Sequence, residues 1–95
     1  MSERPMLMVF CYDVSRSSVR SRVAEMLEDQ AVRVQDSVFE CRLTRRAAER
    51  LFARASALLD DGDSLRMYAV PAAGLARSMA VGRSPIPDDA DHWII

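Results

Sequence analysis

A carboxylate at the end of an apolar run, together with the arginines of the chain, is the part of this sequence best suited to do chemistry. Asp13 ends a run of apolar and aromatic residues, Leu7 to Tyr12, in which apolar and polar positions do not alternate. So short an apolar run predicts a strand that is buried on both faces. Asp13 is then expected where a central strand leaves its sheet, with arginines from the rest of the chain set around it. Arginine is the side chain best shaped for two-point contacts with phosphate.

The charge is distributed unevenly along the chain. The formal net charge is −1 and the pI is about 5.7, so total charge does not indicate a nucleic-acid partner. All 13 basic residues are arginine, and most of them precede residue 60, whereas acids outnumber arginines in the remainder. A second arginine group surrounds the start of a predicted helix, and Arg46, Arg50 and Arg54 share one helical face. That face could follow a duplex backbone or be an ordinary solvated surface.

Length and composition indicate one domain. A chain of 95 residues has room for one hydrophobic core and buries only about 60–65% of its unfolded surface, so a partner subunit would help it. Cys11 and Cys41 lie inside apolar runs without metal-type spacing, which favours two buried thiols over a disulfide. With no signal peptide or transmembrane run, we expect a cytoplasmic protein that does not bind membranes.

Two helices and four strands are predicted from hydrophobic periodicity. Ser15 is a candidate N-cap for a first helix that ends near Gln30, and Thr44 is one for a second helix that the segment Asp60–Asp63 stops. The first helix carries one apolar stripe, and so does the second. Besides the strand at 7–12, strands are predicted at 32–35, 38–43 and 65–70, the middle two joined as a hairpin by Asp36-Ser37.

This order of elements predicts an α+β, ferredoxin-like βαββαβ fold. Right-handed crossovers place both helices on one face of a four-stranded antiparallel sheet. The apolar run 7–12 then leaves side chains on the other face, and a second copy of the sheet is the simplest cover. We therefore expect a sheet-to-sheet homodimer with a core at 1–70 and a tail at 71–95. Within the tail, Met79–Val81 and His92–Ile95 are candidate edge strands that could pack on the dimer partner.

Several segments resemble the small CRISPR-associated Cas-two (Cas2) proteins. The residues that carry the resemblance are Tyr12-Asp13-Val14-Ser15, Arg20-Ser21-Arg22-Val23, Arg33-Val34-Gln35-Asp36-Ser37-Val38-Phe39-Glu40 and Asp63-Ser64-Leu65-Arg66-Met67-Tyr68. The third of these is the most specific. The resemblance covers residues 6 to 70 well and the tail loosely.

The resemblance implies a ferredoxin-like homodimer that acts in the acquisition of CRISPR spacers. Members have been described as metal-dependent endonucleases on single-stranded RNA or double-stranded DNA, and they bridge dimers of the Cas-one (Cas1) integrase. By position, the metal-binding carboxylate corresponds to Asp13, the phosphate-facing arginines to Arg20, Arg22 and Arg33, and the aromatic near the site to Phe39. The chain departs from the pattern by lacking the usual glycine before the second strand, and by an acid in the hairpin turn that would weaken a phosphate contact.

Each of these residues also has a simpler interpretation. Asp13 could cap the first helix or remain solvated, and the arginines could pair with nearby acids such as Glu25 and Asp29. Phe39 alternates with apolar neighbours, so core packing is its default and base stacking the minority interpretation. His92 is the only histidine and lacks a companion at ligand spacing, which leaves no usual general base and argues for a slow enzyme or none.

Three hypotheses follow. The first is an endonuclease in which Asp13 from each chain holds one Mg²⁺, or another divalent cation such as Mn²⁺, because magnesium takes one or two carboxylates plus phosphate oxygens. The second is a non-enzymatic adaptor that presents basic faces to duplex DNA and docks the integrase through its tail. The third, a toxin-like ribonuclease or generic ferredoxin-like module, is disfavoured by the specific hairpin motif.

Overall fold

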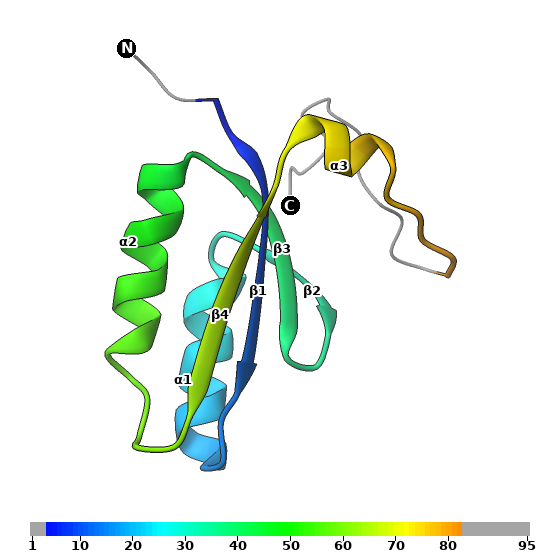
Figure 1. Ribbon diagram of the computed structural model, residues 1–95. Helices are drawn as coiled ribbons and strands as arrows, with labels where there is room; N and C mark the ends of the chain where they lie inside the picture. Colours follow the sequence, from blue (N-terminus) through cyan, green and yellow to red (C-terminus); the bar gives the residue numbers. More distant parts are fainter. Residues whose placement is uncertain (1–3, 83–95) are drawn as a thin grey trace.

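The computed structural model describes residues 4–82, and these form one sheet with three helices (Figure 1). The two long helices were predicted as amphipathic elements, and each lies beside the sheet with its apolar stripe inward. In chain order the elements are β1 (Met6–Asp13), α1 (Ser17–Glu28), β2 (Val32–Gln35), β3 (Val38–Leu43), α2 (Arg45–Ser56), β4 (Ser64–Val70) and α3 (Ala72–Ala76).

The sheet is antiparallel throughout, with the strand order β2-β3-β1-β4. Strand β1 is central, and Phe10 lies opposite Phe39 of β3 and Met67 of β4. Both long helices lie on one face of this sheet (Figure 1). The fold is therefore ferredoxin-like, and the predicted element order, antiparallel sheet and central hairpin are confirmed.

The core lies between the sheet and the two long helices. Phe10 and Phe39 are 0% exposed, and the side chains that pack over them include Val23 and Leu27 of α1 and Leu51 of α2. Fully burying a side chain of this size stabilises the fold by about 1.5–3 kcal/mol. This layer is the main source of stability in the single chain.

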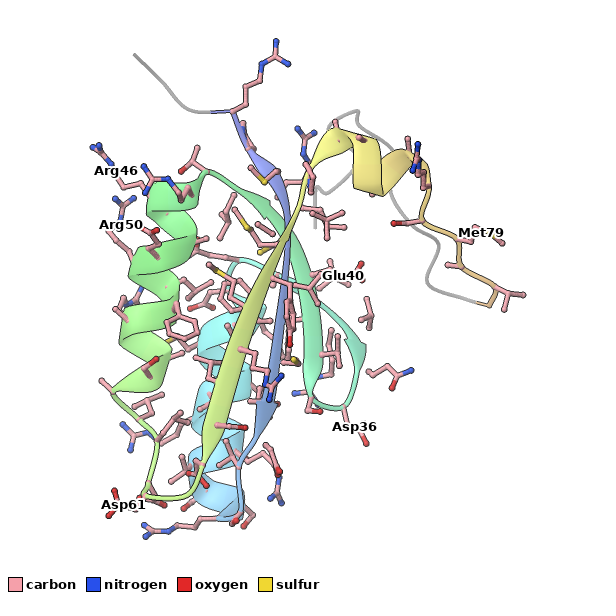
Figure 2. All side chains as sticks on the ribbon, in the orientation of Figure 1. Asp36, Glu40, Arg46, Arg50, Asp61 and Met79 are labelled. Carbon is pink, nitrogen blue, oxygen red and sulfur yellow. The ribbon has the colours of Figure 1, made fainter. Side chains whose placement is uncertain are left out.

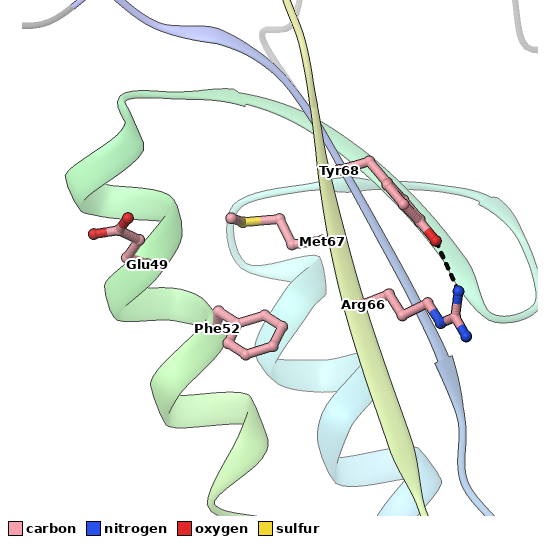
Figure 3. A pocket seen from close by; sticks show the side chains of 5 residues that line it. All are labelled: Glu49, Phe52, Arg66, Met67 and Tyr68. Atoms are coloured by element: carbon pink, nitrogen blue, oxygen red, sulfur yellow. Dashed lines mark hydrogen bonds between the residues drawn. The ribbon is translucent and has the colours of Figure 1, made fainter.

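The opposite face of the sheet is only partly covered. Because side chains alternate along a strand, Val9, Cys11 and Asp13 point away from the helices, and Figure 3 shows the same alternation on β4. Helix α3 packs over one end of this face, where a Cβ added to Gly74 would lie 3.3 Å from Val70 Cγ1. We call the remainder, from Val9 toward Asp13, the open face. That a second copy covers it stays a prediction.

The two cysteines are free and lie on opposite faces of the sheet. Cys41 is buried on the helix side, and burial raises the pKa of its thiol to about 12, so it remains protonated. Cys11 is only half-buried, on the open face. The preference for free thiols over a disulfide is confirmed, but the expectation that both are buried is wrong for Cys11.

The starts of the two long helices differ. Thr44 caps α2 as predicted, because its Oγ1 accepts a hydrogen bond from the Ala47 amide at 3.1 Å. Ser15 was expected to cap α1, but the N-cap residue is Arg16, whose side chain makes no capping hydrogen bond. Instead, the Ser15 amide donates to Asp63 Oδ1 at 3.2 Å, so a distant loop holds the start of this helix.

The tail differs from the expected pattern. Residues 72–76 form α3, which the sequence analysis did not predict, and Leu75 is 8% exposed against the body of the domain. Met79 and Val81 are exposed and belong to no strand in the described chain, so their pairing with a partner's sheet stays a prediction. The candidate strand at His92–Ile95 lies outside the described residues. Across residues 4–82, no helix has the length and apolar character needed to cross a membrane.

Candidate functional site

Asp13 lies at the exposed end of the central strand. It pairs with Ser64 of β4 and points toward the open face. Across residues 4–82, its carboxylate takes part in no hydrogen bond or ion pair, so it does not cap α1. Of the two simpler interpretations, capping is excluded here and solvation remains. An unpaired carboxylate at this position keeps its oxygens available to a ligand.

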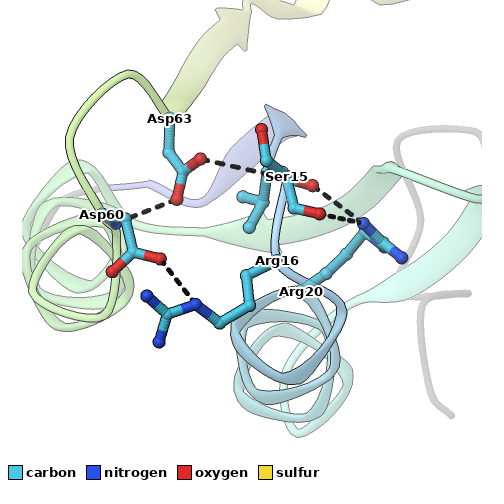
Figure 4. Close-up of polar contacts among 6 residues, drawn as sticks. Ser15, Arg16, Arg20, Asp60 and Asp63 are labelled. Carbon is cyan, nitrogen blue, oxygen red and sulfur yellow. Dashed lines mark hydrogen bonds and ion pairs between the residues drawn. The ribbon is translucent and has the colours of Figure 1, made fainter.

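The loop that follows Asp13 is held by a polar network (Figure 4). Asp63 accepts two backbone hydrogen bonds, from Ser15 N at 3.2 Å and from Asp60 N at 2.9 Å. Arg16 Nε lies 3.3 Å from Asp60 Oδ2. Sequence reasoning missed the positioning role of Asp63, because its partner lies 48 residues away. The Asp-Gly-Asp segment before β4 was the available signal.

Arg20 holds the same loop from the helix side. Its Nη1 donates to the carbonyl oxygens of Val14 at 2.9 Å and Ser15 at 3.1 Å (Figure 4). These two residues directly follow Asp13, so Arg20 fixes the backbone beside the carboxylate. Part of its hydrogen-bonding capacity is already used within the chain, since a guanidinium has five N–H donors.

Arg20 and Arg33 line one hollow between α1 and the β2–β3 hairpin. Its volume is about 240 Å³, and Tyr12, Asp36 and Ser37 also line it. The Tyr12 hydroxyl donates to the backbone oxygen of Asp36 at 3.2 Å. Burial raises the pKa of Tyr12, so the hydroxyl stays a donor at neutral pH. The structure thus brings together two of the three predicted arginines, Arg20 and Arg33. They lie next to Asp36, the acid of the hairpin turn that departs from the family pattern.

Arg33 is held over the aromatic core. Its guanidinium carbon lies 5.1 Å from the centre of the Phe39 ring, and its Nη2 lies 3.4 Å from Glu28 Oε2. The Phe39 ring also stacks on Tyr12 with centroids 6.1 Å apart. Because Phe39 is 0% exposed, a base cannot stack on it in this chain. Core packing, the default interpretation of Phe39, is therefore confirmed, and the minority interpretation, base stacking, does not hold for this ring, which packs against Arg33.

Arg22 lies away from this hollow. It lines a separate groove of about 290 Å³ between α1 and α2, together with Glu25, Asp29 and Arg54. Two acids and two arginines thus share that groove, which gives it no net charge. The structure does not bring Arg22 together with Arg20 and Arg33.

One chain offers a sparse metal site. No group of three or more His, Cys, Asp or Glu side chains among residues 4–82 could hold a metal ion. Asp13 supplies a single free carboxylate, which fits the one or two protein ligands that Mg²⁺ takes when water and phosphate fill its other positions. The donor set therefore fits a divalent cation that is shared with a substrate or a second chain.

The open face beside Asp13 is mixed in character. Tyr68 lies opposite Val9 and is 50% exposed, and its hydroxyl accepts a hydrogen bond from Arg66 Nη1 at 3.0 Å (Figure 3). Glu40 lies on the other side of Val9, and burial raises the pKa of its carboxyl group. This surface combines apolar, cationic and anionic groups and is not a simple hydrophobic patch.

Comparison with known proteins gives a consistent result. The family model described as CRISPR associated protein Cas2 matches residues 6–77, from the first residue of β1 to the residue after α3. A relative in Thermus thermophilus, named CRISPR-associated endonuclease Cas2 2, is 42% identical over 83 residues, which cover 86% of this chain and 88% of the relative. Another, in Chloroflexus aurantiacus, is named CRISPR-associated endoribonuclease Cas2 1. It is 34% identical over 93 residues, 95% of this chain and 100% of the relative.

The fold also matches solved structures. A chain in a structure described as a partial Cas6-RT-Cas1–Cas2 complex superimposes with a TM-score of 0.73. The superposition covers 95% of this chain and 99% of that chain, at 21% sequence identity. At this level of identity, the likeness establishes the fold.

Proposed function

Because this chain belongs to the CRISPR-associated Cas2 family, we propose that it is a metal-dependent endonuclease of CRISPR spacer acquisition, acting in the cytoplasm. Its substrates would be phosphodiester bonds in single-stranded RNA, double-stranded DNA or both. The names of the relatives support a nuclease. The observation that carries the proposal is the free, exposed carboxylate of Asp13 at the end of the central strand.

A homodimer would complete the site. In our proposal the open faces of two copies meet, which covers Val9 and Tyr68 and brings two Asp13 carboxylates toward one Mg²⁺ or Mn²⁺. When bound, this cation would supply an activated water and counter-charge for the pentacovalent transition state. The tail, residues 71–95, would pack on the partner.

The arginines would bind and orient the substrate. Arg33 is held by Phe39 and Glu28 and lines the hollow that it shares with Arg20, where a phosphate could be bound at two points. Arg20 also keeps the backbone after Asp13 in place. Arg22, in the separate groove, would contact a more distant phosphate. The Asp36 carboxylate at the hollow would weaken anion binding there.

The test is cleavage by purified protein with Mg²⁺ or Mn²⁺, on single-stranded RNA and on duplex DNA. Asp13→Asn should abolish cleavage and also remove metal binding measured by titration calorimetry, because the amide lacks the negative charge. Asp61→Asn, in an exposed loop, is the matched control and should behave like the parent protein. Cleavage that survives in Asp13→Asn would exclude the catalytic role of Asp13.

The alternative is a non-catalytic adaptor that binds duplex DNA and bridges the Cas1 integrase. It is favoured by the sparse metal site and by the likeness to a chain in a complex that contains Cas1. Deleting residues 79–95 should then abolish binding to the integrase and leave the core folded, as monitored by circular dichroism. Undiminished integrase binding after this truncation would contradict docking through the tail.

A further inference from the structure

The backbone that follows Asp13 is held from two sides. From α1, Arg20 Nη1 donates to the carbonyl oxygens of Val14 at 2.9 Å and Ser15 at 3.1 Å. From the loop before β4, Asp63 Oδ1 accepts from the Ser15 amide at 3.2 Å. The Asp13 carboxylate itself takes part in no hydrogen bond or ion pair within residues 4–82. A free carboxylate therefore lies on an ordered backbone.

Asp63 ties this segment to the rest of the chain. It directly precedes Ser64, which pairs with Asp13 in the sheet. Both oxygens of its carboxylate are used, since Oδ1 binds the Ser15 amide and Oδ2 accepts from the Asp60 amide at 2.9 Å (Figure 4). The residue is half-buried. Asp63 thus joins the loop before β4 to the segment after β1, beside the pair that contains Asp13.

Asp61 lies two residues away in the same loop but makes no such contacts. It is exposed, and within residues 4–82 its side chain takes part in no hydrogen bond or ion pair. Figure 2 shows Asp61 projecting outward from the loop between α2 and β4. The two acids carry the same charge in the same loop. A comparison of Asp61 with Asp63 therefore separates the effect of the hydrogen bonds from the effect of the charge.

An ordered backbone matters most for a site with a single carboxylate in each chain. If the segment after Asp13 were mobile, a bound cation would have to order it, and the lost conformational entropy would subtract from the affinity. Groups that orient a metal ligand without touching the metal change metal affinity by about 10- to 100-fold when they are removed. Asp63 fits this description, because both of its oxygens bind backbone amides.

We propose that Asp63 is a positioning residue that sets the affinity of Asp13 for a divalent cation. The proposal rests on the proposed function, in which Asp13 binds that cation. Asp63 keeps the backbone after Asp13 in the conformation that binds the cation, through its hydrogen bond to the Ser15 amide, and does not touch the cation itself. The ion pair of Arg16 with Asp60, at 3.3 Å, holds the loop that carries Asp63.

The experiment compares three variants of the full chain with the parent protein. Asp63→Ala removes both acceptors, Asp63→Asn keeps one oxygen acceptor without the charge, and Asp61→Ala is the control. Titration calorimetry measures the dissociation constant of Mn²⁺, and Asp13→Asn identifies the part of the binding that depends on Asp13. Hydrogen exchange measures the protection of the Ser15 amide, and circular dichroism confirms folding.

We expect Asp63→Ala to weaken Mn²⁺ binding by about 10- to 100-fold and to accelerate exchange of the Ser15 amide. Asp63→Asn should lose less affinity, because its amide oxygen can still accept from Ser15. Asp61→Ala should match the parent protein in both measurements.

Three outcomes would overturn the proposal. Faster exchange at Ser15 with unchanged Mn²⁺ affinity would mean that Asp63 only stabilises the fold. Weaker binding in Asp63→Ala with normal exchange at Ser15 would make Asp63 a direct ligand of the cation. Equal losses of affinity in Asp63→Ala and Asp63→Asn, or a loss in Asp61→Ala, would attribute the effect to charge.

The same titrations separate this proposal from the proposed function. Mn²⁺ binding that depends on Asp13 but is unaffected by Asp63→Ala would refute the positioning role and leave the nuclease intact. Binding that depends on Asp63, in a protein that cleaves neither RNA nor duplex DNA, would support the positioning role and favour the adaptor. Absence of Mn²⁺ binding through Asp13 in the parent protein would refute both the positioning role and the metal-dependent activity.

Discussion

The two faces of the sheet are built from the same strands, but the chain buries the side chains of one face far more completely than those of the other. On the helix-covered face, Phe10 and Phe39 are 0% exposed. On the open face, Tyr68 is 50% exposed, and two carboxylates, Asp13 opposite Ser64 and Glu40 opposite Val9, lie beside apolar and polar groups. The chain therefore completes one hydrophobic layer by itself. The open face instead carries exposed aromatic and charged side chains, which suit contact with another molecule.

The largest expected effect is a loss of folding stability on substitution of a residue on the helix-covered face. Phe10→Ala should lower the free energy of unfolding by about 3–5 kcal/mol, because it leaves a cavity where no solvent enters. Urea denaturation measures this loss. Val9→Ala, the adjacent residue on the open face, should cost far less, since its side chain is only half-buried. Equal losses from the two substitutions would show that the faces are equally packed.

The open face can be tested by adding a charge. If two copies meet there, Val9→Arg should weaken self-association at least about hundredfold, because like charges brought together cost several kcal/mol. Sedimentation over a range of concentrations measures it. Ser18→Arg places the same side chain on α1 and should leave association unchanged. An unaltered dimer in Val9→Arg would move the interface elsewhere.

A smaller effect is expected at the start of α2, one of the helices that distinguish the covered face. Thr44→Ala removes the hydroxyl that accepts from the Ala47 amide and should cost about 1 kcal/mol. Thr44→Ser keeps the acceptor and should cost less. Thermal unfolding of the parent protein and both variants measures the two losses of stability. Equal destabilisation by Thr44→Ala and Thr44→Ser would attribute the effect to the lost methyl group.

The smallest effect concerns pH. Burial raises the pKa of Glu40, so in the pH range just above the ordinary value the folded chain binds more protons than the unfolded chain. The free energy of unfolding should therefore fall as pH rises through the raised pKa of Glu40. In Glu40→Gln this part of the pH dependence should disappear, whereas Asp61→Asn should retain it. Identical pH profiles for the parent protein and Glu40→Gln would contradict the assignment.

Much of the fold could be predicted because its signals are local. The hairpin strands lie at 32–35 and 38–43 as predicted, since alternation of apolar side chains is a property of adjacent residues. Thr44 was identifiable because the amide that it caps is three residues away. Asp13 was also identifiable, from the abrupt end of an apolar run. Helix α3 escaped prediction, because a five-residue helix shows too little periodicity to distinguish.

The features that escaped prediction depend on contacts between distant residues. The start of α1 is held by Asp63, 48 residues from Ser15, which no capping pattern contains. The grouping of Arg20 with Arg33, and the separation of Arg22, follow from the direction in which each side chain leaves its element.

By itself the sequence determined the order of strands and helices, the carboxylate at the end of the central strand and the helical face shared by Arg46, Arg50 and Arg54. These are set by spacing along the chain. The tertiary structure alone decided which face of the sheet is filled, which arginines share a hollow and that the Phe39 ring lies beyond the reach of a base. The physical reason is that burial and pairing depend on what packs against a side chain, and here the packing partners come from remote parts of the chain.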